Sequence, residues 1–399
     1  MKRFLIFLVN LRNNFWLSIL KKMTTIQPQK VILWSTYGLQ YSCSPKYIAE
    51  YLSKYHRGDF ELFFAFTPNI MKEEVPKGVH KVQIHNKFRI PSLAFLYHLI
   101  TAKFIITNFR SLGINGLNGK RKGQKYIMTY HCSYAIKPVE FETKDTEQHR
   151  MLLKKENEMT DLMLSSCPDR TNQIREAQAY QGEILEKGTP RVDIIFDNQQ
   201  SERIKEKVYK YFGISYDAKI LLYAPTFRDS NRTDLEIYDL DWEKIISAFE
   251  KRFNCKFYVL IRLHSAIANL SEHLYSSSRV FNSTPYSDIQ ELLVASYALI
   301  TDYSSSPFDF VYTLRPCFSY CPDYEKYIKY DRATLRKDIK TLPFPYSETV
   351  EELVTAILNF DEKSYKMKLN DFVTNEMQSF ENGQASRSLA EWMLAHKNI

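Results

Sequence analysis

Residues 289–310 read IQELLVASYALITDYSSSPFDF, and this stretch indicates the fold of the whole chain. The apolar run Ala298–Thr301 is short and predicts a β-strand, while the patterns near 286–295 and 306–313 predict helices on either side of it. A helix, a strand and another helix in immediate succession are typical of a parallel sheet that is covered by helices on both faces.

The same alternation extends over most of the chain. Strands are expected in two series, at 31–35, 60–66, 103–107, 125–130 and 162–165, and at 219–223, 256–261, 279–281, 298–301 and 317–320. Helical patterns lie between them, near 45–55, 91–101, 145–158 and 170–180, and near 202–212, 241–252, 286–295 and 306–313. We therefore expect an α/β protein of the GT-B-like type, with two doubly wound Rossmann-like domains and a cleft between them.

The segment Lys187–Asp193 carries turn-forming residues and separates the two series. The expected divisions are a basic amphipathic segment at 1–29, an N-terminal Rossmann-like domain at 30–190, a C-terminal Rossmann-like domain at 191–345 and terminal helices at 346–399. Helical patterns near 348–359 and 363–395 are expected to pack back across the domains.

The composition excludes several classes of protein. With 399 residues, 44% hydrophobic and 25% charged, the chain is long enough for two folded domains. Only 11 residues are glycine, and neither glycine-rich phosphate motif, G-x-G-x-x-G or G-x-x-x-x-G-K-[ST], is present. The six cysteines form no C-x-x-C pair, so no metal site and no cofactor are expected, although the sequence does not exclude a divalent cation.

The basic residues concentrate at the N-terminus. Of the net charge of +8, the first thirty residues carry +6, so a nucleic-acid-binding surface on the rest of the chain is not expected. The apolar stretch at 4–20 is interrupted, too short to span a bilayer and not followed by a cleavage site. Basic residues at both ends and aromatic residues in the middle predict a helix on a membrane surface, and an ordinary packed helix is the alternative.

Polar side chains follow four of the predicted strands, at the edge where wound sheets bind ligands. They are His131 after the strand at 125–130, Thr226 and Arg228 after 219–223, Arg262 and His264 after 256–261, and Asp302, Ser304, Ser305 and Ser306 after 298–301. We expect all of them to share the rim of one cleft.

The segment Ser306–Asp309 resembles a capping box, with an N-cap serine, a proline at the first helical position and an acid at the third. A helix start rich in hydroxyls and free backbone N–H groups can bind a diphosphate without glycine-rich loops. A capped structural helix without a ligand is the alternative.

Arg262 and His264 alternate along a strand end and therefore share a face, where they can bind two phosphate oxygens. For each single histidine, including His131, a structural role is the alternative. Phosphoryl transfer needs a proton acceptor for the attacking hydroxyl and cations on the phosphate oxygens, and the four strand ends contain both.

These residues lie within motifs that resemble those of the CDP-glycerol glycerophosphotransferase family, which includes teichoic acid primases and polymerases and related capsule enzymes. The block 289–310 is similar to the family's I-T-D-Y-S-S and F-D-F pattern. The segments 222–228 (LYAPTFR), 188–193 (GTPRVD) and 41–46 (YSCSPK) resemble Y-A-P-T-[FW]-R, G-x-P-R-x-D and Y-x-[DC]-[SN]-P-[KR]. The resemblance covers residues 31–360.

Two motifs depart from the family's pattern. The family's W-H-G-T-P reads Tyr130-His131-Cys132-Ser133, and its R-x-H-P reads Arg262-Leu263-His264-Ser265. Both histidines remain, and the resemblance implies that His131 and His264 are catalytic. It also implies that the N-terminal domain faces the acceptor and that the C-terminal domain binds the CDP donor through Arg262, Thr226, Arg228, Asp302, Ser304, Ser305 and Ser306.

The resemblance implies transfer of glycerol phosphate or ribitol phosphate from a CDP-polyol to a lipid-linked saccharide or polysaccharide acceptor, with release of CMP, in teichoic acid or capsule synthesis. It implies a peripheral enzyme on the cytoplasmic face of the membrane. A GT-B glycosyltransferase that uses a nucleotide sugar is the first alternative. A membrane-bound assembly protein with a decayed site is the second, but the presence of His131, His264 and Asp302 argues against decay.

Overall fold

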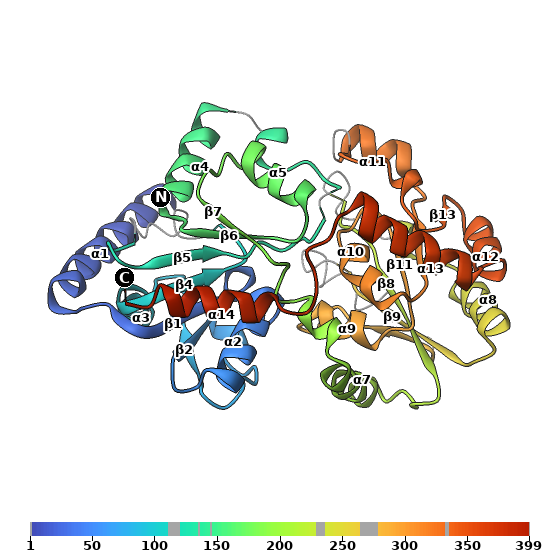
Figure 1. Cartoon of the computed structure of the whole chain (residues 1–399), viewed down its shortest axis with the longest axis horizontal. Helices are drawn as coiled ribbons and strands as arrows, with labels where there is room; N and C mark the ends of the chain where they lie inside the picture. Colours follow the sequence, from blue (N-terminus) through green and yellow to red (C-terminus); the bar gives the residue numbers. More distant parts are fainter. Residues whose placement is uncertain are drawn as a thin grey trace.

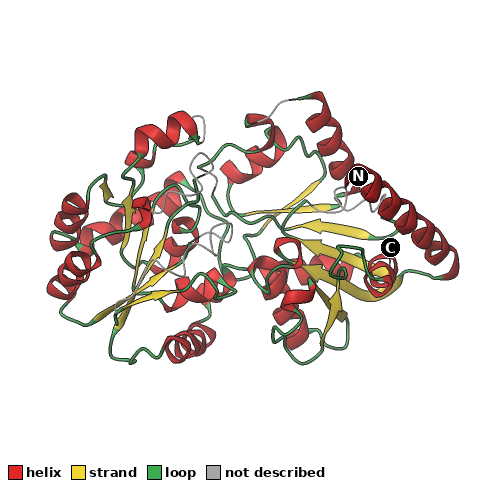
Figure 2. Cartoon of the chain, turned by 180° about the vertical axis from the view of Figure 1, so that it is seen from behind, coloured by secondary structure: helices red, strands yellow, loops and turns green. Residues whose placement is uncertain are grey.

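Two parallel sheets, each enclosed by helices, form the two halves of the chain (Figure 1). The computed structural model describes residues 2–110, 120–134, 136–143, 146–228, 236–263, 278–331 and 335–398, with the backbone alone for 2–7 and 236. Seen from behind, both sheets are again flanked by helices (Figure 2). The expected pair of doubly wound domains is confirmed.

The N-terminal sheet has seven strands whose neighbours all pair in parallel. Their order across the sheet is β3 (Val79–Gln83), β2 (Glu61–Phe66), β1 (Gln27–Trp34), β4 (Ala102–Thr107), β5 (Lys125–Met128), β6 (Leu162–Ser165) and β7 (Glu183–Glu186). Alternate residues of β1 pack into the hydrophobic cores on opposite faces of the sheet. Ile32 and Trp34 pack on one face, and Val31 and Leu33 pack on the other.

Helices cover both faces of this sheet. The helices α1 (Lys2–Met23), α3 (Leu93–Thr101), α4 (Glu147–Met159) and α5 (Pro168–Glu176) contribute side chains to one core. The helices α2 (Cys43–Tyr55) and α14 (Ala385–Ala395) contribute to the other. The C-terminal helix α14 thus completes the N-terminal domain.

The C-terminal sheet has six parallel strands, in the order β10 (Val280–Asn282), β9 (Phe257–Ile261), β8 (Lys219–Ala224), β11 (Ala298–Thr301), β12 (Cys317–Tyr320) and β13 (Tyr346–Ser347). Its helices are α6 (Asp193–Phe196), α7 (Asn198–Phe212), α8 (Trp242–Phe253), α9 (Ile289–Ala295), α10 (Pro307–Phe310), α11 (Tyr324–Tyr330), α12 (Val350–Leu358) and α13 (Glu362–Asp371). Asp241 caps α8 by accepting a hydrogen bond from the Lys244 backbone N–H at 3.1 Å.

The single helical pattern expected at 363–395 is wrong. The helix α13 ends at Asp371, one π-type turn follows at Phe372–Glu376, and α14 begins only at Ala385. In Figure 1 the red α13 lies over the C-terminal domain and the red α14 over the N-terminal domain. The chain has to leave the helical conformation to cross between them, and Gly383 allows this with a φ of +76°.

Three strands were not expected from the sequence: β3 and β7 form the two edges of the N-terminal sheet, and β13 forms one edge of the C-terminal sheet. Edge strands are half-solvated, and β7 has the sequence Glu-Ile-Leu-Glu with no fully buried residue. Because these strands contain few apolar residues, the spacing of apolar residues in the sequence does not predict them.

The expected boundary segment Lys187–Asp193 binds the part of the chain that connects α13 to α14. The backbone N–H of Thr189 donates to Glu381 Oε1 at 2.9 Å, and its hydroxyl donates to the same oxygen at 2.7 Å. Asp193 accepts hydrogen bonds from the backbone N–H groups of Ala385 and Ser386, at 3.0 and 2.7 Å, at the start of α14. These contacts join the interdomain segment to the returning C-terminus.

Replacing Gly188 with alanine is expected to lower the free energy of unfolding by about 2–4 kcal/mol. Gly188 has a φ of +88°, and an added Cβ would overlap the Glu381 carboxylate and lie 3.3 Å from its Cα. Gly213→Ala is the matched control, because Gly213 has a φ of +66° but open space around the Cβ position. Urea unfolding should show a loss of only about 1–2 kcal/mol for the control, and equal losses would contradict the packing argument.

Candidate active site

Both sheets reverse their strand order at points that face one cavity of about 830 Å³. In the N-terminal sheet the reversal lies between β1 and β4, and in the C-terminal sheet it lies between β8 and β11. Ligands of wound sheets bind at such points, beyond the carboxyl ends of the strands. The cavity therefore joins the two expected binding edges into one site between the domains.

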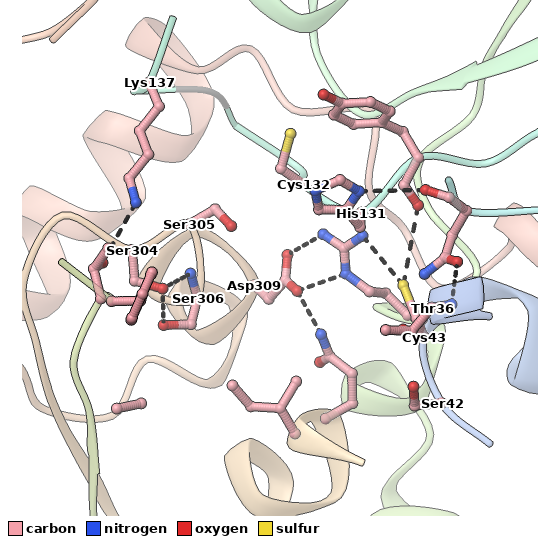
Figure 3. Close-up of a pocket in the computed structure, with 18 of the residues that line it drawn as sticks. Thr36, Ser42, Cys43, His131, Cys132, Lys137, Ser304, Ser305, Ser306 and Asp309 are labelled. Carbon is pink, nitrogen blue, oxygen red and sulfur yellow. Dashed lines mark hydrogen bonds and ion pairs between the residues drawn. The ribbon is translucent and has the colours of Figure 1, made fainter. Parts of the chain in front are cut away.

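His131 follows β5 and forms part of the cavity wall (Figure 3). Its ring lies between Phe109, with centroids 4.3 Å apart, and Tyr130, with centroids 4.5 Å apart, and both pairs are stacked. Its Nδ1 lies 3.3 Å from the backbone carbonyl of Asn108. A carbonyl can only accept, so Nδ1 carries the hydrogen in this contact and Nε2 is left as the proton-accepting nitrogen.

The imidazole of His131 is exposed to the cavity, while protein surrounds it on its other sides. Desolvation by the surrounding protein lowers the pKa of His131 to about 4, the bond to Asn108 acts in the opposite direction, and Arg191 and Arg170 lower it further. The ring is therefore neutral at pH 7 and able to accept a proton.

The opposite wall comes from three neighbouring strands of the C-terminal sheet, β9, β8 and β11. They bring Arg262, Thr226 and the serines Ser304, Ser305 and Ser306 to the cavity, as the sequence predicts. The Arg262 guanidinium donates to the backbone carbonyls of Ser283, at 3.4 Å, and Tyr286. Burial lowers the pKa of Arg262 to about 10, so it stays positively charged at pH 7.

Arg228 and Asp302 lie behind this wall and are not among the residues that line the cavity, and their expected contact with the donor stays a prediction. The Arg228 guanidinium is buried and binds Asp302 at 2.8 Å and Asp323 at 2.8 Å. Asp302 Oδ1 also accepts a hydrogen bond from the Thr226 backbone N–H at 2.7 Å. The two side chains thus bind each other, and both contact the backbone of Thr226.

The expected capping box at Ser306 is wrong. Ser306 has helical backbone angles, and its side chain makes no cap hydrogen bond but donates to Ser304 Oγ at 2.9 Å. The helix α10 that follows has only four residues. The acid of the motif, Asp309, binds Arg191 instead, at 2.7 Å.

Arg191 and Asp309 form the centre of a buried polar cluster that joins the domains, and Asp309 is labelled in Figure 3. Each is 3% exposed. Arg191 donates to both Asp309 oxygens, at 2.7 and 3.0 Å, and to Ser133 Oγ at 2.9 Å. Ser133 and Gln290 also donate to Asp309, each at 2.5 Å. The cluster unites the motif after His131, the boundary segment and the block at 289–310.

Many cavity residues were not among the predicted site residues, and four of them bear on the chemistry of the site: Asn108, Phe109, Lys137 and Arg191. Asn108 and Phe109 follow β4 directly, so the rule that led to His131 would also have found them. Arg191 lies within a recognised motif, but its partner is 118 residues away along the chain. Lys137 has no signal in the sequence beyond its position six residues after His131.

His264, the second predicted catalytic residue, lies outside the described residues, so its place relative to the cavity stays a prediction. Within the described parts of the chain, no group of three or more His, Cys, Asp and Glu side chains is arranged to hold a metal ion.

The sequence profile of the family described as CDP-glycerol:poly(glycerophosphate) glycerophosphotransferase matches residues 17–395. The chain belongs to this family. The match contains all the residues that line the cavity, and the two histidine motifs fall within it.

Curated members of the family resemble the chain over most of its length. It is 29% identical to the teichoic acid poly(glycerol phosphate) polymerase of Bacillus spizizenii over 92% of this chain and 92% of that protein. It is 27% identical to the polymerase of the same description from Staphylococcus epidermidis, over 95% of this chain but 52% of that protein. The chain thus corresponds to about half of the second relative.

Solved structures show the same architecture. The wall teichoic acid polymerase TagF superposes with a TM-score of 0.81 at 25% identity, over 100% of this chain and 98% of that one. The Staphylococcus aureus MnaA–UDP complex superposes with a TM-score of 0.52 at 11% identity, over 93% and 97% of the two chains, which is a likeness of fold alone.

Proposed function

We propose that the chain transfers glycerol phosphate or ribitol phosphate from a CDP-polyol to a hydroxyl of a cell-surface polymer precursor and releases CMP. The observation that carries this proposal is the single cavity with two unlike walls. One wall has a neutral histidine on the N-terminal domain, and the other has a cation and hydroxyl groups on the C-terminal domain. Relatives described as teichoic acid polymerases and primases support the substrate class.

In the proposed step, the acceptor hydroxyl attacks the phosphorus that bears the polyol and His131 Nε2 takes the hydroxyl proton. The bond between this phosphorus and the bridging oxygen breaks, and the bridging oxygen leaves with CMP. Arg262, Thr226 and the serines Ser304 and Ser305 bind the diphosphate oxygens, and His264 is proposed to act with them. Positioning and charge stabilisation account for most of the catalysis in reactions of this kind.

The test is release of CMP by the purified chain from CDP-glycerol and CDP-ribitol, with and without a lipid-linked saccharide acceptor. Acceptor-dependent CMP from one donor supports the proposal and identifies the polyol. If the chain turns over a nucleotide sugar and releases no CMP from either polyol donor, the glycosyltransferase alternative replaces the proposal. No turnover of any donor would favour the assembly-protein alternative.

The pH profile of kcat/KM is expected to have no inflection near pH 6.5 on its acid side. Because the pKa of His131 is lowered to about 4, the proton-accepting neutral form predominates at every pH above about 5. The value of kcat/KM should therefore stay level from pH 8 down to about pH 6 and fall only as the pH approaches 4. Circular dichroism at each pH checks that the protein is folded, and a decline centred near 6.5 would contradict this assignment.

We also propose that α1 binds the cytoplasmic surface of the membrane. One side of α1 packs on the domain through Leu17, which is 6% exposed. Leu8, Leu11 and Phe15, at spacing i, i+3 and i+7, are 43%, 57% and 60% exposed. Lys21 and Lys22 are in the last turn of α1. An exposed apolar stripe beside basic residues fits an anionic lipid surface.

Among the described residues, no helix combines the length and apolar content needed to cross a bilayer. Flotation with vesicles that contain phosphatidylglycerol tests the surface contact. The double variant Leu11→Glu/Phe15→Glu should lose binding, while Leu152→Glu should retain it, because Leu152 is equally exposed, at 55%, but lies on α4. If the double variant binds the vesicles as the wild type does, α1 is not the membrane-binding element.

A further inference from the structure

The loop after His131 crosses from the N-terminal domain into the C-terminal domain. Tyr134 and Ile136 are buried within the core of the C-terminal domain, where the Tyr134 ring lies 4.8 Å from Phe308. The backbone carbonyl of Lys137 accepts a hydrogen bond from Gln173 on α5 at 3.2 Å. Contacts with both domains therefore fix the backbone from which the Lys137 side chain extends.

The Lys137 ammonium lies over the C-terminal wall of the cavity. Its Nζ is 3.5 Å from Thr226 Oγ1, and it lies 5.9 Å from the centre of the Tyr327 ring. In Figure 3 the side chain extends toward the segment that carries Ser304. Thr226 and Ser304 follow β8 and β11, the two strands at the reversal point of the C-terminal sheet.

The described carboxylates near this wall are neutralised by other cations. Arg228 binds Asp302 and Asp323, and Arg191 binds Asp309. Lys137 and Arg262 bring two cationic groups to a wall that also presents the hydroxyl groups of Thr226 and Ser304–Ser306. A wall of this kind suits an anion with several oxygens, such as the diphosphate of a nucleotide.

We infer that Lys137 binds the diphosphate of the donor, so that the domain carrying His131 also supplies a cation to the donor. This inference rests on the proposed function and adds to it a donor-binding residue from the opposite domain. An ammonium on the diphosphate oxygens offsets their charge both in the bound donor and as the bond to CMP breaks.

The experiment measures the dissociation constants of CDP and of cytidine for the wild type, Lys137→Met and Lys137→Arg. Lys137→Met should weaken CDP binding about 10- to 100-fold and leave cytidine binding within about twofold, because cytidine has no phosphate. Lys137→Arg keeps the charge and should restore most of the CDP affinity. Lys363→Met, at an exposed position on α13, is the matched control and should bind CDP as the wild type does.

Salt dependence separates a direct charge contact from a structural role. The CDP affinity of the wild type should fall more steeply with salt than that of Lys137→Met, while both should unfold at the same temperature. If Lys137→Met binds CDP as tightly as a CDP-binding wild type, the inference is wrong and the proposed function stands. If the wild type binds no CDP and releases no CMP from CDP-polyols, both are overturned.

Discussion

Replacing His131 with alanine is expected to lower kcat by about 10²- to 10⁴-fold and to leave the dissociation constant of the CDP-polyol within about threefold of wild type. The ring is held between Phe109 and Tyr130 with Nδ1 at the Asn108 carbonyl, which directs Nε2 to act as the proton acceptor. It belongs to the wall opposite the proposed donor site, so its loss removes proton transfer rather than donor binding. Steady-state CMP release and direct donor binding measure the two effects separately.

The control for this prediction is His85→Ala. His85 is half-buried and is not among the cavity residues, and its ring makes a local contact, from Nδ1 to the Asn86 backbone carbonyl at 2.8 Å. Its replacement should change neither kcat nor donor affinity. A His131→Ala variant that loses donor binding, or one that keeps full turnover, would contradict the role of His131 as the proton acceptor.

Replacing Arg191 with alanine is expected to lower the free energy of unfolding by about 3–5 kcal/mol. Arg191 and Asp309 are each 3% exposed, so removal of the guanidinium leaves a buried carboxylate without its charge partner. Ser133 also loses a bond from Arg191, and the joint between the two domains is weakened. Urea unfolding followed by tryptophan fluorescence measures the change.

Arg387→Ala is the matched control, because Arg387 pairs with Glu391 at 3.0 Å on the surface of α14 with both side chains more than 60% exposed. Its loss should cost at most about 0.5 kcal/mol. The double variant Arg191→Met/Asp309→Leu should recover much of the lost stability, since an apolar pair leaves no buried charge. Equal stability of Arg191→Ala and Arg387→Ala would contradict the importance of the cluster.

Local patterns were sufficient to predict most of the fold. Every strand expected between residues 31 and 320 is present, and all of them except the edge strand β10 are central runs whose apolar character is visible without knowledge of their neighbours. The misses have two physical causes. The edge strands β3 and β7 are half-solvated, and the break between α13 and α14 is required by the path of the chain between two domains, which no local pattern records.

The candidate site was predicted in part. His131, Thr226, Arg262 and Ser304–Ser306 line the cavity, because position at the end of a parallel strand is readable from the sequence. Arg228 and Asp302 were placed on the same rim, but strand-end position does not reveal whether a side chain faces the ligand or a neighbouring charge. In the structure they bind each other at 2.8 Å and are not among the residues that line the cavity.

The sequence by itself determined the two wound domains and the strand ends that line the cavity, because these follow from periodicity and chain order. Only the tertiary structure decided which strand ends share one cavity, that Asp309 binds Arg191 instead of capping a helix, and that Lys137 reaches the opposite domain. These contacts join residues far apart in the chain, up to 118 positions for Arg191 and Asp309. Such pairs depend on how the two domains pack against each other, and no local pattern in the sequence records that packing.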